Sequence, residues 1–393
     1  MGDAVIMSAV RTPIADARKG GLATVSVHDL AKASVVEALK RSGVAVEDVD
    51  DLILGEVMQG GGCIARYVAN DLGLPPDLPG MAVNRACASG LSAVNTAAAG
   101  IRAGMDRVVI AGGVESMTQT PATYQRSPLP WGGMTPWISP THPDSPEAPN
   151  LNMGITVGEN TAEQCGITRE DQDAWAYRSH RRAVAAIDEG RFADELVAVQ
   201  VPGRRGEVSV VDTDEHPRRD TTPEKLAALP ALFKAGGTVT AGNSSSLNDG
   251  SCAVVLTDSA YAAEHDIAPL AVVRSWTSVG VPPRETGIAP TLAIPRALRR
   301  AGLHLDDLAL VEINEAFASM AVACTRVLGL DPGIVNVNGG AVGLGHPVAC
   351  SGARILTTLV HELRRRGGGY GLASLCAGGG MGAATVVEVL PPG

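Results

Sequence analysis

Aromatic residues make up only 3% of this 393-residue chain, and charged residues only 19%. The scarcity of aromatic side chains disfavours an aromatic-cored β-sandwich and favours tightly packed layers of helices and strands. Basic residues are also in deficit, because the formal net charge is −10. We therefore expect no nucleic-acid partner and no anionic membrane partner. The apolar runs are far shorter than the ~20 residues that a membrane-spanning helix needs.

Cysteine pairs with CxxC spacing are also missing, although the chain has seven cysteines. Neither a disulfide framework nor a metal site is indicated. The N-terminal stretch has an acid at Asp3, no basic region and an apolar run broken at Arg11, unlike a signal peptide. The C-terminal PPG carries no lipidation or organelle signal. From these absences we expect a soluble protein of the cytoplasm.

Small and apolar residues are what the chain has in abundance. Hydrophobic residues make up 45% of it, and there are 46 glycines. Such a composition can bury a large core and is unlike that of a disordered chain. The length suits two or three compact units.

An internal repeat is visible in the sequence. Residues 38–56 (ALKRSGVAVEDVDDLILGE) align without a gap with residues 297–315 (ALRRAGLHLDDLALVEINE), at an offset of 259. Each copy predicts an amphipathic helix that stops at a glycine, Gly43 or Gly302, and is followed by an acidic pair and a short strand. We infer a duplication. Strands that alternate with helices predict mostly parallel sheets covered on both faces.

A different kind of segment lies between the two halves. Eight prolines fall between Pro121 and Pro149 in a stretch without periodicity, which predicts loop. A helix with a capping-box start at Thr168 and Asp171 is expected next, ending near Gly190. We place an inserted loop domain at 118–248. The first half then comprises residues 1–117 and 249–268, and the second half residues 269–393.

The same offset of 259 relates a cysteine to a histidine, each in a small-residue turn before a predicted helix. Cys87 lies in VNRACASG and His346 in GLGHPVACSG. A cysteine at a helix N-terminus is placed to form a thiolate, although a free cysteine is more often a buried small hydrophobe. If the halves pack about a pseudo-twofold axis, His346 meets Cys87 and can act as its base. The alternative is a histidine that only packs.

Two further polar positions follow strands of the second half. Cys376 precedes Ala377 and three glycines, so a second sulfur and backbone N–H groups lie at a strand end. A tight glycine turn would explain the same pattern without chemistry. Asn314, in NEAF, is polar where an apolar continuation is expected, and a helix cap would explain it equally well.

Taken together, these stretches resemble one family. The blocks VNRACASG, GGVESM, GTVTAGNSSSLNDG, VEINEAFA, NGGAVGLGHPVACSGARIL and LCAGGGMG are similar to the signature blocks of thiolases and occur in the family's order along nearly the whole chain. The resemblance implies an α/β thiolase fold. Its two duplicated βαβαβαββ halves would pack as a five-layer αβαβα sandwich that carries the inserted loop domain.

The resemblance also implies a reaction and the residues that perform it. By similarity, Cys87 is the acylated nucleophile, His346 accepts its proton and Cys376 is the second acid/base. Asn314 holds a water that forms one oxyanion hole with His346, and the N–H groups of Cys87 and Gly378 form the other. An acyl-enzyme predicts ping-pong kinetics. The reaction is a reversible Claisen condensation of acyl-CoA molecules.

The loop domain would bind coenzyme A, which is a substrate, as is acetyl-CoA; no permanently bound cofactor is implied. The family's binding positions correspond here to Ser245, Phe233, Arg218, Met153, Ala316, Phe317 and Thr286. A solvated surface position is the alternative for Arg218. The family also suggests a homotetramer made of tight dimers.

Several departures from the family pattern bear on the acyl chain. NSSS replaces Asn-Ala-Ser-Gly, Asn152 stands where many acetyl-CoA-specific members have His, and MGITVGEN has one extra residue. Thr286 replaces a usual Met and could leave room for a longer or branched acyl group. GHPVACSGAR and LCAGGGMG are nearer the biosynthetic branch, so two acetyl-CoA giving acetoacetyl-CoA is our first expectation. The alternatives are a degradative 3-ketoacyl-CoA thiolase, a ketoacyl synthase-like enzyme and a non-catalytic acyl-CoA or lipid binder.

Overall fold

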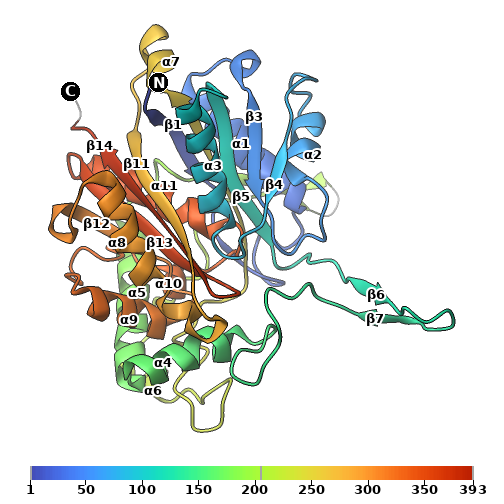
Figure 1. Ribbon diagram of the computed structural model, residues 1–393, viewed down its shortest axis with the longest axis vertical. Helices are drawn as coiled ribbons and strands as arrows, with labels where there is room; N and C mark the ends of the chain where they lie inside the picture. Colours follow the sequence, from blue (N-terminus) through green and yellow to red (C-terminus); the bar gives the residue numbers. More distant parts are fainter. Residues whose placement is uncertain (1, 204–205, 392–393) are drawn as a thin grey trace.

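Five layers of helices and sheets make up the body of the molecule. The structure is a computed structural model, and it describes residues 2–203 and 206–391. Helices α1 (Val27–Ser42) and α2 (Ile64–Asp71) cover the outer face of the first half-sheet, and α8 (Pro290–Ala301) covers the outer face of the second. Helices α3 (Ser89–Ala103) and α11 (Ser351–Arg365) pack against each other between the two half-sheets (Figure 1). The predicted α/β sandwich of five layers is therefore confirmed.

The elements of the first half follow the expected βαβαβαββ order. They are β1 (Ala4–Arg11), α1 (Val27–Ser42), β3 (Asp51–Gly55), α2 (Ile64–Asp71), β4 (Met81–Val83), α3 (Ser89–Ala103), β5 (Val108–Ser116) and β10 (Asn248–Asp258). A short strand, β2 (Ala15–Asp16), pairs with the start of β10, and α7 (Ser259–Glu264) follows β10.

The second half repeats this order with one difference. Its elements are β11 (Ala271–Gly280), α8 (Pro290–Ala301), β12 (Leu308–Ile313), α9 (Ala318–Leu328), α10 (Ala341–Leu344), α11 (Ser351–Arg365), β13 (Gly369–Ala377) and β14 (Met381–Val389). The counterpart of β4 is reduced to a bridge between Val311 and Val335. The second half therefore departs from the predicted βαβαβαββ order at this one strand.

The sheet itself shows the duplication. Its strand order is β12-β13-β14-β11-β1-β10-β5-β3-β4, so the two halves mirror each other about the β1–β11 pair. The two half-sheets meet there through Val5 opposite Val272 and Ile6 opposite Ala271. The repeated helices both end at a glycine with positive φ, since Gly43 and Gly302 each have a φ of 71°. The repeat inferred from residues 38–56 and 297–315 thus corresponds to equivalent elements.

The expectation of mostly parallel sheets is wrong. Among the described residues, only the β3–β4, β3–β5 and β12–β13 ladders of the central sheet are parallel. Its other ladders are antiparallel, including β13–β14, where β14 turns back directly on β13, and β5–β10. A direct return connection places strands antiparallel, whereas a helical crossover leaves them parallel.

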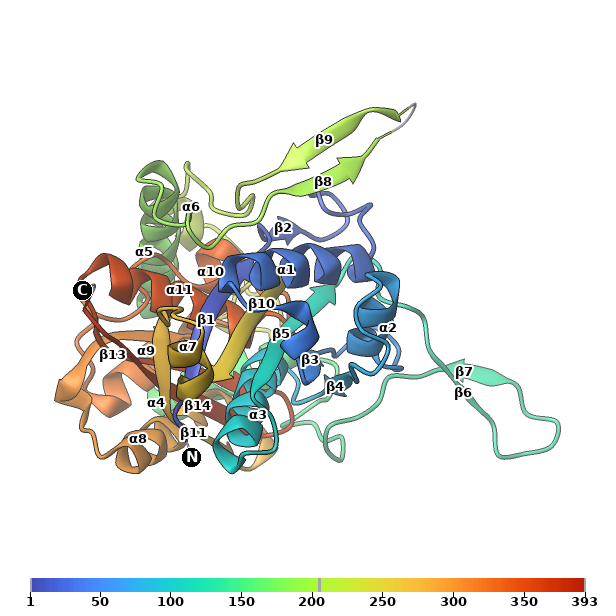
Figure 2. The same ribbon diagram turned by 90° about the horizontal axis from the view of Figure 1, so that it is seen from above.

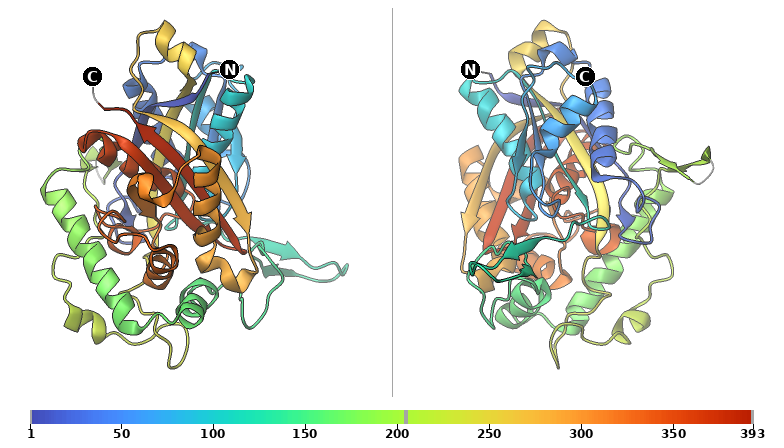
Figure 3. Two further views of the ribbon diagram at one scale, coloured as in Figure 1. Left: turned by 60° about the vertical axis from the view of Figure 1, so that its left-hand side comes forward. Right: turned by 90° about the vertical axis from the view of Figure 1, so that its right-hand side faces the viewer.

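The segment between β5 and β10 lies at one end of the sandwich and extends beyond it. It contains β6 (Tyr124–Arg126), β7 (Met134–Pro136), the π-helix η2 (Gly154–Glu159), α4 (Asn160–Cys165), α5 (Arg169–Asp188), β8 (Val199–Pro202), β9 (Val208–Val211) and α6 (Pro223–Ala227). Helix α5 begins with the predicted capping box of Thr168 and Asp171. The β6–β7 and β8–β9 hairpins project from the body (Figures 2 and 3).

Close packing of α3 on α11 determines where the candidate site lies. A Cβ added at Gly90 would lie 2.6 Å from the carbonyl oxygen of Ala349, and one added at Gly352 would lie 2.6 Å from the amide nitrogen of Leu91. The N-terminal ends of α3 and α11 therefore lie so close together that only glycine fits at positions 90 and 352. This contact brings the turns that carry Cys87 and His346 side by side. Across residues 2–203 and 206–391, no helix is both long enough and apolar enough to cross a bilayer.

Candidate active site

Cys87 is held at the start of α3 by a strained turn. Ala86, directly before it, has a φ of 46°, a left-handed conformation that alanine rarely adopts. The hydroxyl of Ser89 donates to the carbonyl of Ala86 at 2.7 Å and accepts from the amide of Arg85 at 2.8 Å. These bonds fix the turn, so that Cys87 stands at the N-terminal end of α3 as predicted.

Burial and backbone N–H groups shift the pKa of the Cys87 thiol in opposite directions. Burial raises the pKa of its thiol to about 11, although the backbone N–H groups of Gly378 and of Cys87 itself act to lower it. Desolvation thus opposes the effect of the helix N-terminus and favours the protonated thiol before substrate binds. The same two N–H groups were predicted to form an oxyanion hole, and both lie at the Cys87 sulfur. A base is therefore needed to form the nucleophile.

His346 is held from its backbone and from its ring. Its amide donates to Oδ1 of Asn248 at 2.7 Å. The hydroxyl of Ser351 donates to the carbonyl of Pro347 at 2.9 Å, so it accepts from Nδ1–H of His346 at 2.5 Å. This arrangement places the ring proton on Nδ1 and leaves Nε2 with a free lone pair.

Nε2 of His346 is buried and has no hydrogen-bond partner among the described residues. Burial, with a smaller contribution from the charge of Arg354, lowers the pKa of His346 to about 4. The imidazole is therefore neutral near pH 7 and can accept a proton.

Cys376 lies beside Cys87 at the end of β13. It is buried, with Sγ 3.7 Å from Sδ of Met320. Burial, and then the neighbouring sulfurs of Cys87 and Cys324, raise the pKa of Cys376 well above its ordinary value. The Cys87 and Cys376 thiols are therefore neighbours, and burial favours the protonated form of each.

The glycine turn after Cys376 is held by Thr286. The Thr286 hydroxyl donates to the carbonyl of Pro283 at 2.6 Å and accepts from the amide of Gly380 at 2.9 Å. Met153 lies next to the same turn, because a Cβ added at Gly378 would be 3.6 Å from its Sδ. Thr286 and Met153 thus adjoin the glycines that follow Cys376.

Asn314 presents a second buried polar group with no partner. Neither Oδ1 nor Nδ2 has a hydrogen-bond partner among the residues that the structure describes, although its amide nitrogen donates to the carbonyl of Ser374 at 2.9 Å. A buried side-chain amide normally satisfies its hydrogen bonds. An exception of this kind is typical of a site that awaits a ligand or a water.

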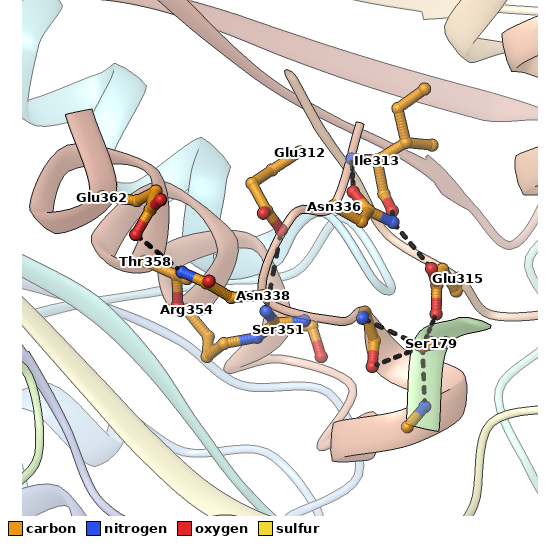
Figure 4. A network of polar contacts seen from close by, with 12 residues as sticks. Ser179, Glu312, Ile313, Glu315, Asn336, Asn338, Ser351, Arg354, Thr358 and Glu362 are labelled. Carbon is orange, nitrogen blue, oxygen red and sulfur yellow. Dashed lines mark hydrogen bonds and ion pairs between the residues drawn. The ribbon is translucent and has the colours of Figure 1, made fainter. Parts of the chain in front are cut away.

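The neighbouring Glu315 anchors the turn that carries Asn314. Its carboxylate accepts from Nδ2 of Asn336 at 2.8 Å and from the hydroxyl of Ser179 at 2.6 Å (Figure 4). It also accepts from Nε1 of Trp175 at 2.8 Å. These donors belong to α5 and to the loop after α9. The insertion and the second half are thereby tied together beneath Asn314.

Most of the predicted coenzyme contacts also come together. The amide of Ser245 donates to the carbonyl of Ala316 at 3.0 Å. Phe233 and Phe317 are edge to face, with ring centroids 6.1 Å apart. A Cβ added at Gly154, next to Met153, would lie 2.2 Å from the Phe233 ring. The five predicted residues Ser245, Phe233, Met153, Ala316 and Phe317 thus form one cluster.

Arg218 is set apart from this cluster and is exposed. It lines a pocket between the insertion and α10, together with His180, His216, Asp220, Thr221, Lys225, Leu226, Leu229, Ala241, Gly242 and Val342. Lys225 is paired with Asp220 at 2.7 Å, and the Arg218 guanidinium suits an anionic ligand. Within the described part of the chain, no group of three or more His, Cys, Asp or Glu side chains is arranged to hold a metal ion.

Two family descriptions match almost the whole chain. "Thiolase, N-terminal domain" covers residues 4–260, and "Thiolase, C-terminal domain" covers residues 267–389. This chain belongs to the thiolase family. The predicted family and fold are confirmed.

Individual thiolases are similar over their full lengths. An acetyl-CoA acetyltransferase of Syntrophomonas wolfei is 42% identical, with 99% of each chain covered. A 3-ketoacyl-CoA thiolase of Bacillus subtilis is 45% identical, with 99% of this chain and 100% of the relative covered. The crystal structure of the Bacillus anthracis acetyl-CoA acetyltransferase matches with a TM-score of 0.90 and 41% identity, covering 99% of each chain.

The extra residue of MGITVGEN has a structural counterpart in this thiolase. Residues Gly154–Glu159 form a π-helix, which is the form a helix takes when it accommodates one inserted residue. This π-helix packs against the 3₁₀ segment Pro283–Ile288. A Cβ added at Gly287 would lie 3.2 Å from the carbonyl oxygen of Val157 in the π-helix and 1.9 Å from Oγ1 of Thr161 in α4. The extra residue and Thr286 thus belong to one tightly packed region.

Sequence reasoning missed several residues that support the thiolase site. Asn248 and Ser351 hold His346 in place. Ala86 forms the turn before Cys87, and Glu115 is the fourth such residue. The Glu115 carboxylate accepts from the amide of Ala349 at 3.2 Å and from Nε2 of Gln59 at 2.7 Å, and burial raises its pKa to about 7. Asn248 and Glu115 are polar residues within the quoted blocks SLNDG and GGVESM, a signal that could have identified them.

The equivalence of Cys87 and His346 in the repeat is approximate. Helix α3 begins at Ser89 and α11 at Ser351, which are 262 residues apart, whereas Cys87 and His346 are 259 apart. The two catalytic candidates therefore occupy neighbouring positions of equivalent turns, and His346 lies three residues further from its helix. The longer turn is occupied by Pro347, whose carbonyl accepts the bond from Ser351.

Proposed function

We propose that this thiolase joins two acetyl-CoA molecules into acetoacetyl-CoA and coenzyme A, reversibly, through an acyl-enzyme on Cys87. The observation that carries the proposal is the convergence of two thiols with two unpaired buried groups. Cys87 and Cys376 adjoin, and Nε2 of His346 and the Asn314 amide have no partner among the described residues.

The first half-reaction begins with proton transfer from the Cys87 thiol to Nε2 of His346. The thiolate attacks the thioester carbonyl, and the resulting oxyanion is stabilised by hydrogen-bond donors placed in advance. When the tetrahedral intermediate collapses, the C–S bond to coenzyme A breaks. Cys376 gives its proton to the leaving thiolate, so that an acetyl-Cys87 and a Cys376 thiolate remain.

The second half-reaction uses that Cys376 thiolate as the base. It removes an α-proton from the second acetyl-CoA while the developing enolate oxygen is held by the other donor set, for which we propose Asn314 and protonated His346. The enolate carbon attacks the acetyl carbonyl, and the Cys87 thiolate leaves and regains its proton from His346. Losing one donor of either set is expected to cost ~10²–10³ in rate.

Coenzyme A would lie across the insertion. The cluster of Ser245, Phe233, Met153, Ala316 and Phe317 suits the narrow pantetheine arm, and the pocket with Arg218 suits the phosphorylated adenosine. We retain 118–248 as the loop domain, flanked by a first half of 1–117 with 249–268 and a second half of 269–393. No permanently bound cofactor is needed, because coenzyme A enters and leaves as a substrate.

A second candidate is a thiolase that acts on longer or branched 3-ketoacyl chains. It is favoured by the π-helix at Gly154–Glu159 and by Thr286, which together reshape the region beside Cys376. The name of the Bacillus subtilis relative, a 3-ketoacyl-CoA thiolase, also supports it.

The experiment is coenzyme A-dependent cleavage of acetoacetyl-CoA and of a medium-chain 3-ketoacyl-CoA, with Cys87→Ser as the control. Fast cleavage of acetoacetyl-CoA, lost in the variant, supports the first proposal. A preference for the longer substrate supports the second. No cleavage of either contradicts both, and leaves a ketoacyl synthase-like enzyme or a non-catalytic binder.

We also propose a homotetramer in the cytoplasm. The β6–β7 hairpin and its flanks expose apolar side chains: Tyr124, Leu129, Trp131, Met134, Trp137 and Ile138. An exposed apolar arm of this kind is typical of a segment that another subunit covers. The cytoplasmic location rests on the sequence alone.

A further inference from the structure

A chain of hydrogen bonds connects the Arg218 pocket with His346, and its first member is Asn248. Asn248 is fully buried, and its Oδ1 accepts from the amide of His346 at 2.7 Å. Gly345 has a φ of 106°, and a Cβ added there would lie 2.6 Å from Cγ of Asn248. The Asn248 side chain therefore packs directly on the turn of His346, so that neither can move without the other.

Ser246 and His216 continue the chain. The Ser246 hydroxyl donates to Oδ1 of Asn248 at 2.8 Å, and its oxygen lies 3.2 Å from Nδ1 of His216. The hydrogen bond from His216 lowers the pKa of Asp16 to about 2, so Asp16 is ionised near pH 7. An ionised carboxylate only accepts, and thus the proton on Nδ1 of His216 is shared between Asp16, at 2.7 Å, and Ser246.

The far end of the chain forms a wall of the pocket. His216 and His180 both line it, with ring centroids 5.8 Å apart, and the amide of Arg218 donates to Nδ1 of His180 at 3.2 Å. A phosphate bound by Arg218 in this pocket would therefore lie near the His216 imidazole, while Lys225 pairs with Asp220 of the same pocket at 2.7 Å. Asp16 fixes the ring from behind, and Lys19 pairs with Asp16 at 3.1 Å.

We propose that His216, Ser246 and Asn248 are positioning residues that couple occupancy of the Arg218 pocket to the placement of His346. The inference rests on the proposed function, because the pocket ligand is the phosphoadenosine end of coenzyme A. When the anion enters, His216 shifts its shared proton and its contact with Ser246, and Asn248 transmits the change to the His346 turn. The base of the reaction is then fully placed only when a coenzyme is bound.

The test uses adenosine 3′,5′-bisphosphate, a probe that fills the pocket but has no arm to cover Cys87. Its binding is measured by calorimetry, and its effect is read as the rate at which iodoacetamide alkylates Cys87, followed by peptide mass spectrometry. In the natural protein the bound probe changes that rate by about fivefold or more, as expected for coupled sites. In Ser246→Ala the probe binds equally well and the rate no longer responds.

Further variants keep the test decisive. Ser209→Ala, on the exposed β9 strand, is the matched control and behaves like the natural protein. In thiolysis, Ser246→Ala lowers kcat and leaves KM for coenzyme A unchanged.

Three results would overturn the proposal: a probe that binds without changing the alkylation rate, an unchanged response in Ser246→Ala, or a probe that does not bind the natural protein. Normal thiolysis by the natural protein alongside any of them confines the failure to the coupling and leaves the proposed function intact.

Discussion

The Cys87 thiol and the His346 imidazole are both uncharged at rest, because burial raises the pKa of the first to about 11 and lowers that of the second to about 4. A thiolate–imidazolium pair would show the opposite pattern, with a low thiol pKa. In this thiolase the proton is therefore expected to move only when a substrate is present to stabilise the charge that develops.

This assignment predicts the pH dependence of Cys87 alkylation in the free enzyme. Between about pH 6 and pH 9 the rate should rise about tenfold per pH unit, because the thiolate fraction grows in that proportion below the pKa. The measurement is iodoacetamide labelling of Cys87, with Cys87→Ser giving the background from other cysteines. A rate that stays constant over this range would indicate a preformed ion pair and would be inconsistent with the neutral pair.

Ser351 provides a second prediction, because its hydroxyl fixes the proton of His346 on Nδ1. Ser351→Ala should lower kcat about fivefold, which is the value of one net hydrogen bond of about 1 kcal/mol. KM for acetoacetyl-CoA should change little, since the buried hydroxyl contacts His346 and Pro347 and acts through the imidazole. Steady-state thiolysis measures both constants, and Ser351→Thr should recover part of the loss. An unchanged kcat would show that the Ser351 hydroxyl does not orient the base.

The sequence points to the candidate reactive residues, but it does not show which polar residues hold them in place. Cys87, His346, Cys376 and Asn314 stand in distinctive local motifs. Asn248 is 98 residues from His346, and only the folded sheet brings them together. The raised thiol pKa was also missed, because the sequence shows a helix N-terminus but not the burial that outweighs it.

Glycines where α3 meets α11 set the geometry on which both turns depend. Gly90→Ala would place a Cβ 2.6 Å from the Ala349 carbonyl and 3.0 Å from the Ala353 amide, which are backbone atoms that cannot yield easily. We expect a loss of about 1–3 kcal/mol in the free energy of unfolding, typical of overpacking, and reduced activity as the turns separate.

Urea unfolding of Gly90→Ala beside Gly133→Ala checks this expectation. A Cβ at Gly133 meets nothing within 4 Å, so that variant should unfold like the natural protein. Equal stability of the two variants would mean that α3 and α11 can separate without cost, against the packing described above.

Local signals predicted elements better than they predicted strand direction. The glycine stops at Gly43 and Gly302 and the capping box at Thr168 were readable, because each depends on a few adjacent residues. The antiparallel pairing of β10 with β5 could not be predicted, because the whole insertion separates the two strands in the sequence. The sequence carries no local mark of which way a strand re-enters a sheet.

The molecule as a whole leaves an apolar arm uncovered, and Trp131 at its tip is 97% exposed. The ends of the arm adjoin, because the amide of Trp137 donates to the carbonyl of Thr123 at 2.9 Å. Replacing residues 124–136 with a short Gly-Ser turn should therefore preserve the fold. We expect it to reduce the proposed tetramer to a dimer, as measured by light scattering on a sizing column. An unchanged particle mass would show that the arm does not mediate assembly.

All of these features act in one reaction only if Cys87 carries the acyl group. The decisive measurement is the mass of the intact chain, followed by peptide mapping, after brief mixing with acetyl-CoA alone. We predict one acetyl group per chain, located on Cys87, with release of coenzyme A, and none in Cys87→Ser. An unmodified chain, or an acetyl group on another residue, would contradict the proposed mechanism.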